Sequence, residues 1–434
     1  MDLILFRVST QKMCVVAVLT LFGLLTAPIR SEDWPQWRGP SRDGVWGETG
    51  IMESFPEEGL KVLWSAPVGW GWSSPVVAQG RVFVTDSELM QSKVKERVHC
   101  FDATNGNSLW TYAYDETYPE WVYVAGQEMG PSATPIVDAG KLYTVGGNGY
   151  VHCFDAEKGD LHWEKNLGKE YQIEAVMCRA SPLIDGDLLI VFTGAKPGAC
   201  VIAIDKNSGK EIWKSLDESV SNSSPILITA GGTKQLIVWT QQSVISLAPE
   251  TGETYWQHPL KTINDYVVAT PVHHGNLLLI SGLMMELAPD KPTATVLWPK
   301  TNAVSRRVMS NTSTAMFRSD HLFSAKSTGE LVCIEAATGQ QVWEVDTVTD
   351  LRNGASIHLT ANGDSVFMFT DKGELIRAQV TSQGYKEISR SHLLEPTSPF
   401  GGRKVAWTPP AFADRHVFAR SDKELVCVSL AAEQ

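Results

Sequence analysis

The stretch IDKNSGKEIW, residues 204–213, contains an acidic residue, a turn with glycine and a short run that ends in tryptophan. Six runs of this kind follow one another, with their tryptophans at intervals of 53, 50, 43, 42 and 45 residues. Such a period is typical of repeated supersecondary units, none of which can bury its apolar face alone. We expect the tryptophans that end these runs, together with one near the start of the chain, to dock each unit against its neighbour: Trp64, Trp110, Trp163, Trp213, Trp256, Trp298 and Trp343.

Each repeat predicts four short antiparallel strands. It begins with a small residue, then Ser or Thr, then Pro, followed by an apolar run, as in SSPVV at 73–77. Proline is tolerated at the first residue of a strand, where its missing N–H costs no ladder hydrogen bond. A second strand follows after a turn, a third carries a small residue at a fixed place, and the fourth ends in tryptophan. Four-stranded units repeated around an axis form a β-propeller.

Two weaker repeats near the C-terminus complete the count. One runs from Ser356 to Ile388, which stands where tryptophan is expected, and the other begins at Thr408 and stops one strand short. The missing strand is supplied by LKVLWSAPV, residues 60–68, near the start of the chain. Pairing the two ends of the chain removes the free sheet edges. The predicted fold class is therefore all-β: an eight-bladed β-propeller of four-stranded antiparallel blades, closed by N-terminal strand pairing with the C-terminal blade.

The N-terminus has the pattern of a secretory signal. Arg7 and Lys12 precede an apolar run of about fifteen residues, which is the size of a signal-peptide core. A membrane span needs roughly twenty apolar residues. We expect cleavage between Ala27 and Ser31, a periplasmic or secreted protein and no membrane span in the mature chain; an uncleaved anchor is the alternative. The predicted domains are a signal peptide at 1–31, a leader packing on the propeller at 32–59 and the propeller at 60–434.

The charge of the chain argues against a nucleic-acid partner. The formal net charge is −12, the isoelectric point is near 5.4, and no basic run of five residues occurs. Phosphate binding needs clustered Lys and Arg.

Six cysteines follow the signal segment, and four of them occupy one position of the repeat, two residues before its acidic or polar residue. Neighbouring sheets lie roughly 10 Å apart, whereas bridged Cα atoms approach within about 7 Å. We therefore expect small buried thiols at this position, and the sequence leaves open whether the other two cysteines pair. The four are Cys100, Cys153, Cys333 and Cys427; the other two are Cys178 and Cys200.

A blade that ends in D-x-x-T-G-x-x-x-W resembles the tryptophan-docking motif of the PQQ-like (pyrroloquinoline quinone repeat) eight-bladed propellers. IDKNSGKEIW and IEAATGQQVW are nearest to it, with Ser208 in place of Thr and Glu335 in place of Asp. The resemblance covers residues 60–434. The segment DWPQWRGPSRDG, 33–44, is also similar to the leader of secreted PQQ-like repeat proteins.

The resemblance implies different functions in different branches of the family. Quinoprotein alcohol dehydrogenases hold the quinone and calcium in the central channel, against a disulfide between adjacent cysteines and beside an Asp base. This chain has no adjacent cysteine pair, and no catalytic Asp or calcium ligand matches residue by residue. The propeller subunit of outer-membrane β-barrel assembly machinery is a protein-binding scaffold without a cofactor, but it is a lipoprotein, and a lipoprotein cleavage box is absent here. The chain is most similar to the secreted PQQ-like repeat proteins.

The loops that lead from one blade into the next are rich in aromatic and charged residues. In a propeller these loops surround one mouth of the channel, where aromatic faces beside guanidinium and amide groups suit a planar, anionic or sugar-like ligand. The alternative is that they fill the mouth and pair with one another. The candidate ligand-binding residues are Trp70, Trp72, Trp121, Glu128, Arg179, Asn222, Asp265, Arg307, Asn311, Arg352, Arg403 and Trp407.

The long connection at 109–132 is either a recognition loop or a lid packed on the rim. No zinc spacing, nucleophile elbow or phosphate-binding loop occurs, so we predict no metal site, and the catalytic residues are unknown. The leading hypothesis is a secreted or periplasmic, non-catalytic propeller that binds a protein or a polymeric ligand, carbohydrate included, through one face. The rival is a PQQ-dependent oxidoreductase of alcohols or sugars with an atypical site. A spacer in an envelope assembly is a third alternative.

Overall fold

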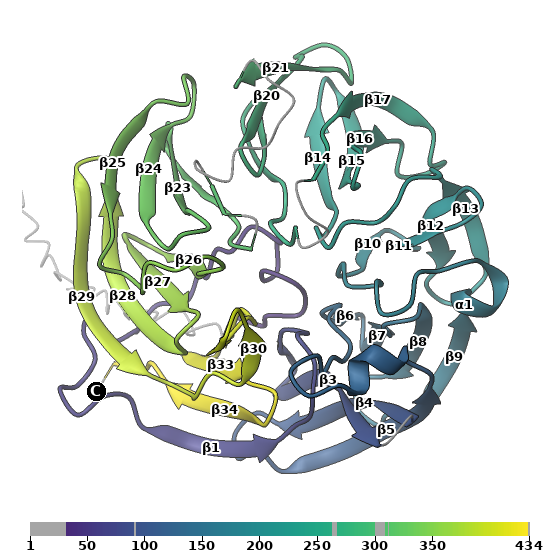
Figure 1. Ribbon diagram of the computed structural model, residues 1–434, viewed down its shortest axis with the longest axis horizontal. Helices are drawn as coiled ribbons and strands as arrows, with labels where there is room; N and C mark the ends of the chain where they lie inside the picture. Colours follow the sequence, from purple (N-terminus) through teal and green to yellow (C-terminus); the bar gives the residue numbers. More distant parts are fainter. Residues whose placement is uncertain (1–31, 91–92, 263–266, 300–308, 311, 433–434) are drawn as a thin grey trace, which may run out of the picture. The chain divides into compact units, whose positions relative to one another are not determined.

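The strands form eight four-stranded antiparallel sheets arranged around a central axis (Figure 1). The computed structural model describes residues 32–432 except 91–92, 263–266, 300–308 and 311. Each of the first seven blades takes its four strands consecutively from the chain, from the axis outward. The predicted eight-bladed propeller is confirmed.

The first four blades lie between residues 76 and 259. Their strands are β2 (Val76–Ala78), β3 (Arg81–Met90), β4 (Lys93–Asp102) and β5 (Ser108–Glu116); β6 (Ile136–Asp138), β7 (Lys141–Val145), β8 (Tyr150–Asp155) and β9 (Leu161–Asn166); β10 (Leu183–Asp185), β11 (Leu188–Ala195), β12 (Ala199–Asp205) and β13 (Glu211–Ser215); and β14 (Ile226–Ala230), β15 (Thr233–Trp239), β16 (Ser243–Leu247) and β17 (Thr254–Pro259). Two short helical turns, η1 (Glu120–Tyr123) and α1 (Leu167–Glu170), lie in connections between blades.

Blades 5 to 8 complete the ring. Their strands are β18 (Val272–His274), β19 (Leu277–Ile280), β20 (Leu283–Leu287) and β21 (Ala294–Trp298); β22 (Met316–Arg318), β23 (His321–Ala325), β24 (Leu331–Glu335) and β25 (Gln341–Val345); β26 (Ile357–Asn362), β27 (Ser365–Thr370), β28 (Glu374–Thr381) and β29 (Gly384–His392); and β32 (Ala411–Ala413), β33 (His416–Arg420), β34 (Glu424–Ser429) and β1 (Val62–Pro67). A separate hairpin, β30 (Ser398–Phe400) and β31 (Arg403–Val405), precedes blade 8.

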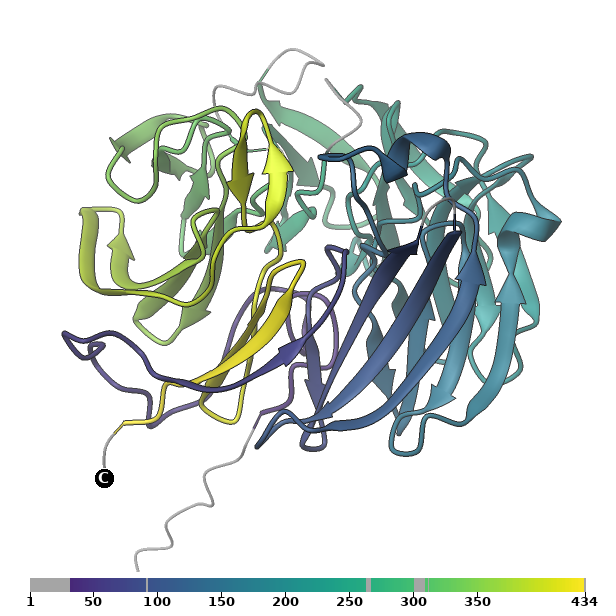
Figure 2. The ribbon, with the colours of Figure 1, turned by 60° about the horizontal axis from the view of Figure 1, so that its bottom comes forward.

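The first and last strands of the propeller pair antiparallel, with Trp64 opposite Cys427. Figure 2 shows β1 and β34 side by side, although they lie more than 350 residues apart in the chain. This pairing supplies the fourth strand that the last blade lacks. The predicted closure is confirmed.

The tryptophans at the ends of the outer strands join neighbouring blades. The indole N–H of Trp64 donates to the carbonyl oxygen of Ala103 in the next blade, 3.0 Å away. Trp256 differs and donates to Gln235 in its own blade, because the next blade carries a distorted turn without the usual glycine. The other inter-blade bonds join Trp110 to Ala156, Trp163 to Lys206, Trp213 to Pro249, Trp298 to Ala336 and Trp343 to Thr381.

The turn glycines meet two requirements at once. Gly106 has a φ of +73°, which a residue with a side chain adopts only under strain. A Cβ at this position would also lie 2.5 Å from the ring of Trp64. The same steric contact recurs where Gly159, Gly209, Gly252 and Gly339 meet the tryptophan of the preceding blade.

The column of small residues lies directly opposite the tryptophans. Cys100 pairs with Trp110 across the sheet, and Cys153 pairs with Trp163. A small side chain at this place leaves room for the indole. All six cysteines within the described residues are buried and free, including Cys178 and Cys200.

Blade 7 departs from this register. Ala378, its small residue, pairs with Glu387, and the ladder shifts before Ser389 pairs with Arg377. Ile388 therefore falls at a bulge. The expectation that Ile388 replaces the tryptophan is wrong, because the bulge sits one pair away from its place in the other blades.

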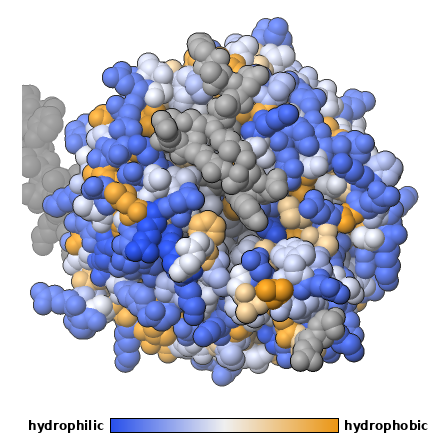
Figure 3. All heavy atoms as spheres, in the orientation of Figure 1, coloured by the Kyte–Doolittle hydropathy of each residue, from blue (hydrophilic) through white to orange (hydrophobic). Residues whose placement is uncertain are grey.

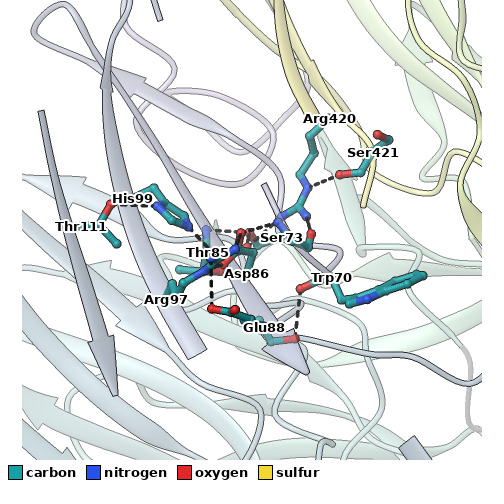
Figure 4. A network of polar contacts seen from close by, with 12 residues as sticks. Trp70, Ser73, Thr85, Asp86, Glu88, Arg97, His99, Thr111, Arg420 and Ser421 are labelled. Atoms are coloured by element: carbon teal, nitrogen blue, oxygen red, sulfur yellow. Dashed lines mark hydrogen bonds and ion pairs between the residues drawn. The ribbon is translucent and has the colours of Figure 1, made fainter. Parts of the chain in front are cut away.

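A buried polar network strengthens the seam between the last and first blades (Figure 4). Arg420 lies at the end of β33 and donates to the carbonyl oxygens of Thr85 and Gly69. Asp86 accepts two hydrogen bonds from Arg97, at 2.7 and 2.8 Å. Burial alone would raise the pKa of Asp86, but hydrogen bonds from His99 and Arg97 outweigh burial and hold this pKa well below its usual range.

Candidate functional site

The first part of the leader, residues 34–48, contacts the inner part of the blades around one end of the channel, and Figure 1 shows it in the middle of the ring. The following residues run outward to the rim, where the N–H of Phe55 donates to the Ser389 hydroxyl on the outer strand β29. Trp34 forms an antiparallel bridge with Val77 of blade 1. Farther along, Trp46 donates its backbone N–H to Ala361 of blade 7. The Glu48 carboxylate accepts the backbone N–H of Asp414 in blade 8. The leader thus joins blades that are distant in sequence.

Arg42 is the most deeply inserted cation of the leader. Its guanidinium donates to the carbonyl oxygens of Pro182 at 2.8 Å, Pro225 at 3.1 Å and Ser181 at 3.4 Å. The residue is 9% exposed. Burial, with repulsion from Arg38, lowers the pKa of Arg42 to about 9. These carbonyls belong to the entry of the inner strands of blades 3 and 4, so Arg42 links these two neighbouring blades.

Trp37 forms the boundary between the leader and the open part of the channel. Its indole N–H donates to the Thr270 hydroxyl of blade 5 at 2.8 Å. The side chain is buried and lines a cavity on the other side. The leader therefore forms the floor of this cavity.

The Ser/Thr-Pro steps surround the same channel. The backbone N–H of Ser74 donates to the Thr134 hydroxyl at 3.0 Å, and that of Thr134 donates to the Ser181 hydroxyl at 3.1 Å. The N–H of Ser181 in turn donates to the Ser224 hydroxyl at 3.0 Å. Each hydroxyl links its blade to the preceding one. The Ser/Thr-Pro step therefore starts an inner strand and also links neighbouring blades through its hydroxyl.

The cavity has a volume of about 850 Å³ and is lined by aromatic, hydroxyl, amide and cationic side chains. Cavities of this size hold ligands of a few tens of non-hydrogen atoms. The lining comes from the leader and from connections of blades 1 to 8. Its aromatic, polar and charged side chains, together with the thioether of Met129, are Trp37, Trp72, Gln127, Glu128, Met129, Ser132, Arg179, Ser181, Asn222, Ser224, Thr312, Ser327, Asn353, His358, Phe400, Arg403, Lys404 and Trp407.

Trp72 and Arg179 form one wall. The guanidinium carbon of Arg179 lies 5.5 Å from the centre of the Trp72 ring, within the range of a cation–π interaction. The Trp72 indole N–H donates to the Ser398 hydroxyl at 3.2 Å, and Ser398 donates to the buried carboxylate of Asp422. The aromatic face is thus fixed by a second layer of hydrogen bonds.

Arg403, on the β30–β31 hairpin, is held from behind by Asp371. Its Nη1 donates to this carboxylate, which is fully buried and also accepts a hydrogen bond from Thr349 at 2.7 Å. The other terminal nitrogen, Nη2, is buried and has no acceptor among the described residues, so it does not face the open cavity. The guanidinium nevertheless borders the cavity as a fixed cation, which suits an anionic oxygen.

His358 also lines the cavity, as a neutral side chain. Burial lowers its pKa to about 4, and Nε2 lies 2.9 Å from the carbonyl oxygen of Trp407. This contact positions the Trp407 segment at the mouth.

Six of the nine described candidate residues line the cavity: Trp72, Glu128, Arg179, Asn222, Arg403 and Trp407. Three do not: Trp70 makes a backbone bridge with Ser87, and Trp121 and Arg352 are exposed on connections that supply other lining residues. Asp265, Arg307 and Asn311 lie outside the described residues.

Sequence reasoning missed Trp37, His358 and Phe400. Trp37 belongs to a leader that occurs once, so no repeat pointed to it. His358 stands in the inner strand β26, whereas the predicted site residues lie in the loops between blades. Phe400 directly precedes the glycine pair Gly401–Gly402 of the hairpin, three residues before Arg403, and this position beside a turn was the available signal.

The described lining does not fit a quinone held by calcium. Glu128 is the single carboxylate among these lining residues, and no cysteine lines the cavity. No group of three or more His, Cys, Asp or Glu residues that could hold a metal ion occurs within the described ranges. In the same part of the chain, no helix is long and apolar enough to cross a bilayer.

Comparison with known proteins places this architecture in a family. Residues 94–288 and 285–386 match the family model described as outer membrane protein assembly factor BamB. The chain belongs to this family.

Curated relatives of this BamB-family chain include two proteins with the same description. The one from Burkholderia pseudomallei is 26% identical over 236 residues, which cover 52% of this chain and 58% of the relative. The one from Shewanella oneidensis is 22% identical over 350 residues, covering 79% and 73%. A quinoprotein ethanol dehydrogenase from Pseudomonas aeruginosa is 26% identical over 159 residues, or 32% of this chain and 25% of the enzyme. The chain thus spans less than two thirds of the Burkholderia relative.

Solved structures show the same fold. BamB from Moraxella catarrhalis has a TM-score of 0.55 at 16% identity, covering 85% of this chain and 99% of that one. A europium-containing methanol dehydrogenase has a TM-score of 0.64 at 11% identity, covering 90% of each chain. At these identities the likeness concerns the fold alone, because one propeller fold hosts unrelated functions.

Proposed function

We propose that this protein is a non-catalytic scaffold of the bacterial envelope, periplasmic or secreted, that binds a protein partner through the face bearing the cavity mouth. Its family membership supports a role in outer-membrane protein assembly, the function in the names of its two BamB relatives. The described lining residues offer no fitting site for a metal or a quinone, which supports binding over catalysis.

The observation that carries the proposal is the pattern of exposed apolar side chains on the connections that supply the cavity lining. Trp121 is 43% exposed and Val124 is 57% exposed, shortly before the lining residues that begin at Gly126. Leu351 is 51% exposed two residues before Asn353. Exposed aromatic and apolar residues beside a pocket are typical of protein-binding surfaces. The surface in Figure 3 is otherwise largely hydrophilic, with apolar residues scattered over it.

The test is site-specific photo-crosslinking in envelope preparations of the native host. A photoreactive amino acid replaces Trp121 or Phe400, and a matched control replaces Lys386, which is exposed on the outer strand β29. We expect a discrete adduct with an envelope protein from Trp121 and Phe400 and none from Lys386. An adduct from Lys386 alone would favour a spacer whose contacts lie on the outer strands. Oxidation of alcohols or sugars by the purified protein with added PQQ and calcium would contradict the non-catalytic role.

A further inference from the structure

We propose that the central cavity binds the end of an acidic saccharide chain, with its carboxylate on Arg403 and its sugar rings against the tryptophan faces. This inference goes beyond the protein-scaffold function and does not depend on it. It rests on three features of the cavity: a closed floor, a lining that combines aromatic and hydroxyl-bonding groups, and three cations against one carboxylate among the described lining residues.

The floor determines that the ligand enters and leaves by one mouth. Trp37 closes the cavity from below and is tied to Thr270, while Arg42 fixes the leader to Pro182 and Pro225. A polymer therefore cannot thread through the channel. A volume of about 850 Å³ accommodates a short terminal segment of a few sugar rings.

The lining matches the two kinds of surface that a sugar ring presents. Its C–H faces pack on aromatic rings, and its hydroxyl edges need hydrogen-bond donors and acceptors. The described lining has four large aromatic side chains but only Met129 and Val268 as flexible or branched aliphatic ones. A lipid or an aliphatic peptide segment would find few partners here. The aromatic residues are Trp37, Trp72, Phe400 and Trp407; the hydroxyl and amide residues are Gln127, Ser132, Ser181, Asn222, Ser224, Thr312, Ser327 and Asn353.

The acidic preference comes from the cations of the lining. Arg179, Arg403 and Lys404 line the cavity, whereas Glu128 is the single carboxylate among the described lining residues. Asp371 holds Nη1 of Arg403 from behind and orients the guanidinium, and a ligand carboxylate beside this fixed cation would gain a charge-assisted interaction. Lys404 follows on the same hairpin and is exposed, so its charge is also available at the mouth.

The test is a calorimetric titration of the purified mature chain with tri-galacturonate, and with maltotriose as the neutral trisaccharide. We expect saturable binding of tri-galacturonate at one site and at least about tenfold weaker binding of maltotriose, since one charge-assisted hydrogen bond corresponds to about a tenfold change in affinity. Long polygalacturonate at the same uronate concentration should bind less, in proportion to its fewer chain ends.

Variants separate this site from non-specific charge. Arg403→Lys keeps a cation but removes the planar guanidinium that Asp371 orients, and we expect about tenfold weaker binding. Trp72→Leu keeps apolar volume and removes the flat face, with a similar expected loss. Lys404→Gln changes an exposed side chain and should weaken binding about threefold. Because this variant is expected to fold, it still tests the site if Arg403→Lys or Trp72→Leu misfolds. Arg81→Gln removes a surface arginine paired with Glu157 and should leave binding unchanged.

Several results would overturn the proposal. They are no detectable binding of tri-galacturonate, equal binding of both trisaccharides, or equal affinity in the wild type and the Arg403 and Trp72 variants. Tighter binding of a defined acidic peptide, Gly-Asp-Glu-Asp-Gly, in the same cavity would replace the saccharide with a protein segment. Retention of PQQ after desalting, lost in Arg403→Lys and unaffected by tri-galacturonate, would assign the cavity to a quinone. None of these outcomes alters the crosslinking result that tests the protein partner.

Discussion

The two ends of the central channel differ in the kind of hydrogen bonding they contain. At the leader end, Arg42 donates to three carbonyl oxygens and Trp37 to one hydroxyl, and both side chains are buried, although the Nε of Arg42 has no acceptor among the described residues. At the mouth, Arg403 uses one terminal nitrogen on Asp371 and leaves the other without an acceptor within the described residues. The two arginines differ instead in their surroundings: Arg42 is enclosed by backbone carbonyls, whereas Arg403 lines an open cavity. We therefore expect substitutions at the closed end to change mainly stability and substitutions at the mouth to change mainly ligand binding.

The largest loss of stability is expected from Arg42→Met. This change leaves the carbonyls of Ser181, Pro182 and Pro225 without their donor, and a buried unsatisfied group costs about 1–3 kcal/mol. We expect a loss of about 3 kcal/mol in the free energy of unfolding, measured by urea denaturation. At the mouth, Lys404→Met should cost less than about 0.5 kcal/mol because the side chain is exposed. Equal costs at the two ends would remove the distinction between them.

Substitution of a turn glycine that contacts a docked tryptophan should lower the free energy of unfolding, as substitution at the closed end does. Gly106→Ala faces both a positive φ and the ring of Trp64, and we expect a loss of about 2–3 kcal/mol. Gly80→Ala is the matched control: its φ of +72° is almost the same, but nothing lies within 4 Å of the added Cβ. Its expected cost is about 1 kcal/mol. If both variants lose the same stability, the docked tryptophan contributes no steric constraint.

A smaller, pH-dependent effect on the free energy of unfolding is expected from Glu96. This residue lies beneath the connection at 117–132, part of which lines the mouth. Its buried carboxylate accepts hydrogen bonds from Tyr114, Tyr118 and the N–H of Gly147, but burial outweighs them and raises its pKa above 4.5. A raised folded-state pKa means that the folded protein holds this proton more tightly than the unfolded chain. The stability contributed by this group is present below the unfolded pKa and is lost as the pH rises through the folded pKa.

Glu96→Gln removes this titration. We expect the difference in unfolding free energy between variant and wild type to shift in favour of the variant as the pH rises above about 4.5. Urea denaturation from pH 4 to pH 8 measures it. A difference independent of pH, or a shift toward the wild type, would show that the carboxylate is not destabilised by burial.

The smallest stability effect is expected from Trp121→Ala. This side chain is exposed and lies outside the cavity, so the free energy of unfolding should change by less than about 0.5 kcal/mol. Partner capture through the mouth should nevertheless fall, because an exposed tryptophan is a frequent energetic centre of interfaces. Co-purification of the crosslinked partner measures this loss; unchanged capture would place the docking surface elsewhere.

Repetition explains which features could be predicted from the sequence. The tryptophans, the glycine turns and the Ser/Thr-Pro steps recur, so each copy supports the others, and together they predicted eight blades and the pairing of β1 with β34. Ile388 was misplaced because the bulge in blade 7 shifts by one pair, a change that residue spacing does not reveal.

The site was less predictable because its contacts are unique and join distant segments. Arg42 lies 140 residues from Pro182, and Trp37 lies 233 residues from Thr270. Arg403 was singled out as a charged loop residue, but its orientation depends on Asp371, at the end of an inner hairpin of another blade. No local pattern in the sequence encodes these pairings.

Hydrogen exchange of the leader amides tests the central claim most directly, namely that the leader is an integral part of the ring and closes one end of its channel. The N–H groups of Trp34 and Trp46 donate to Val77 and Ala361 of the inner strands. We predict that these two amides exchange as slowly as the amides of β2 and β26 themselves. Exchange at the rate of an exposed loop would contradict the account, since the channel would then be open at both ends.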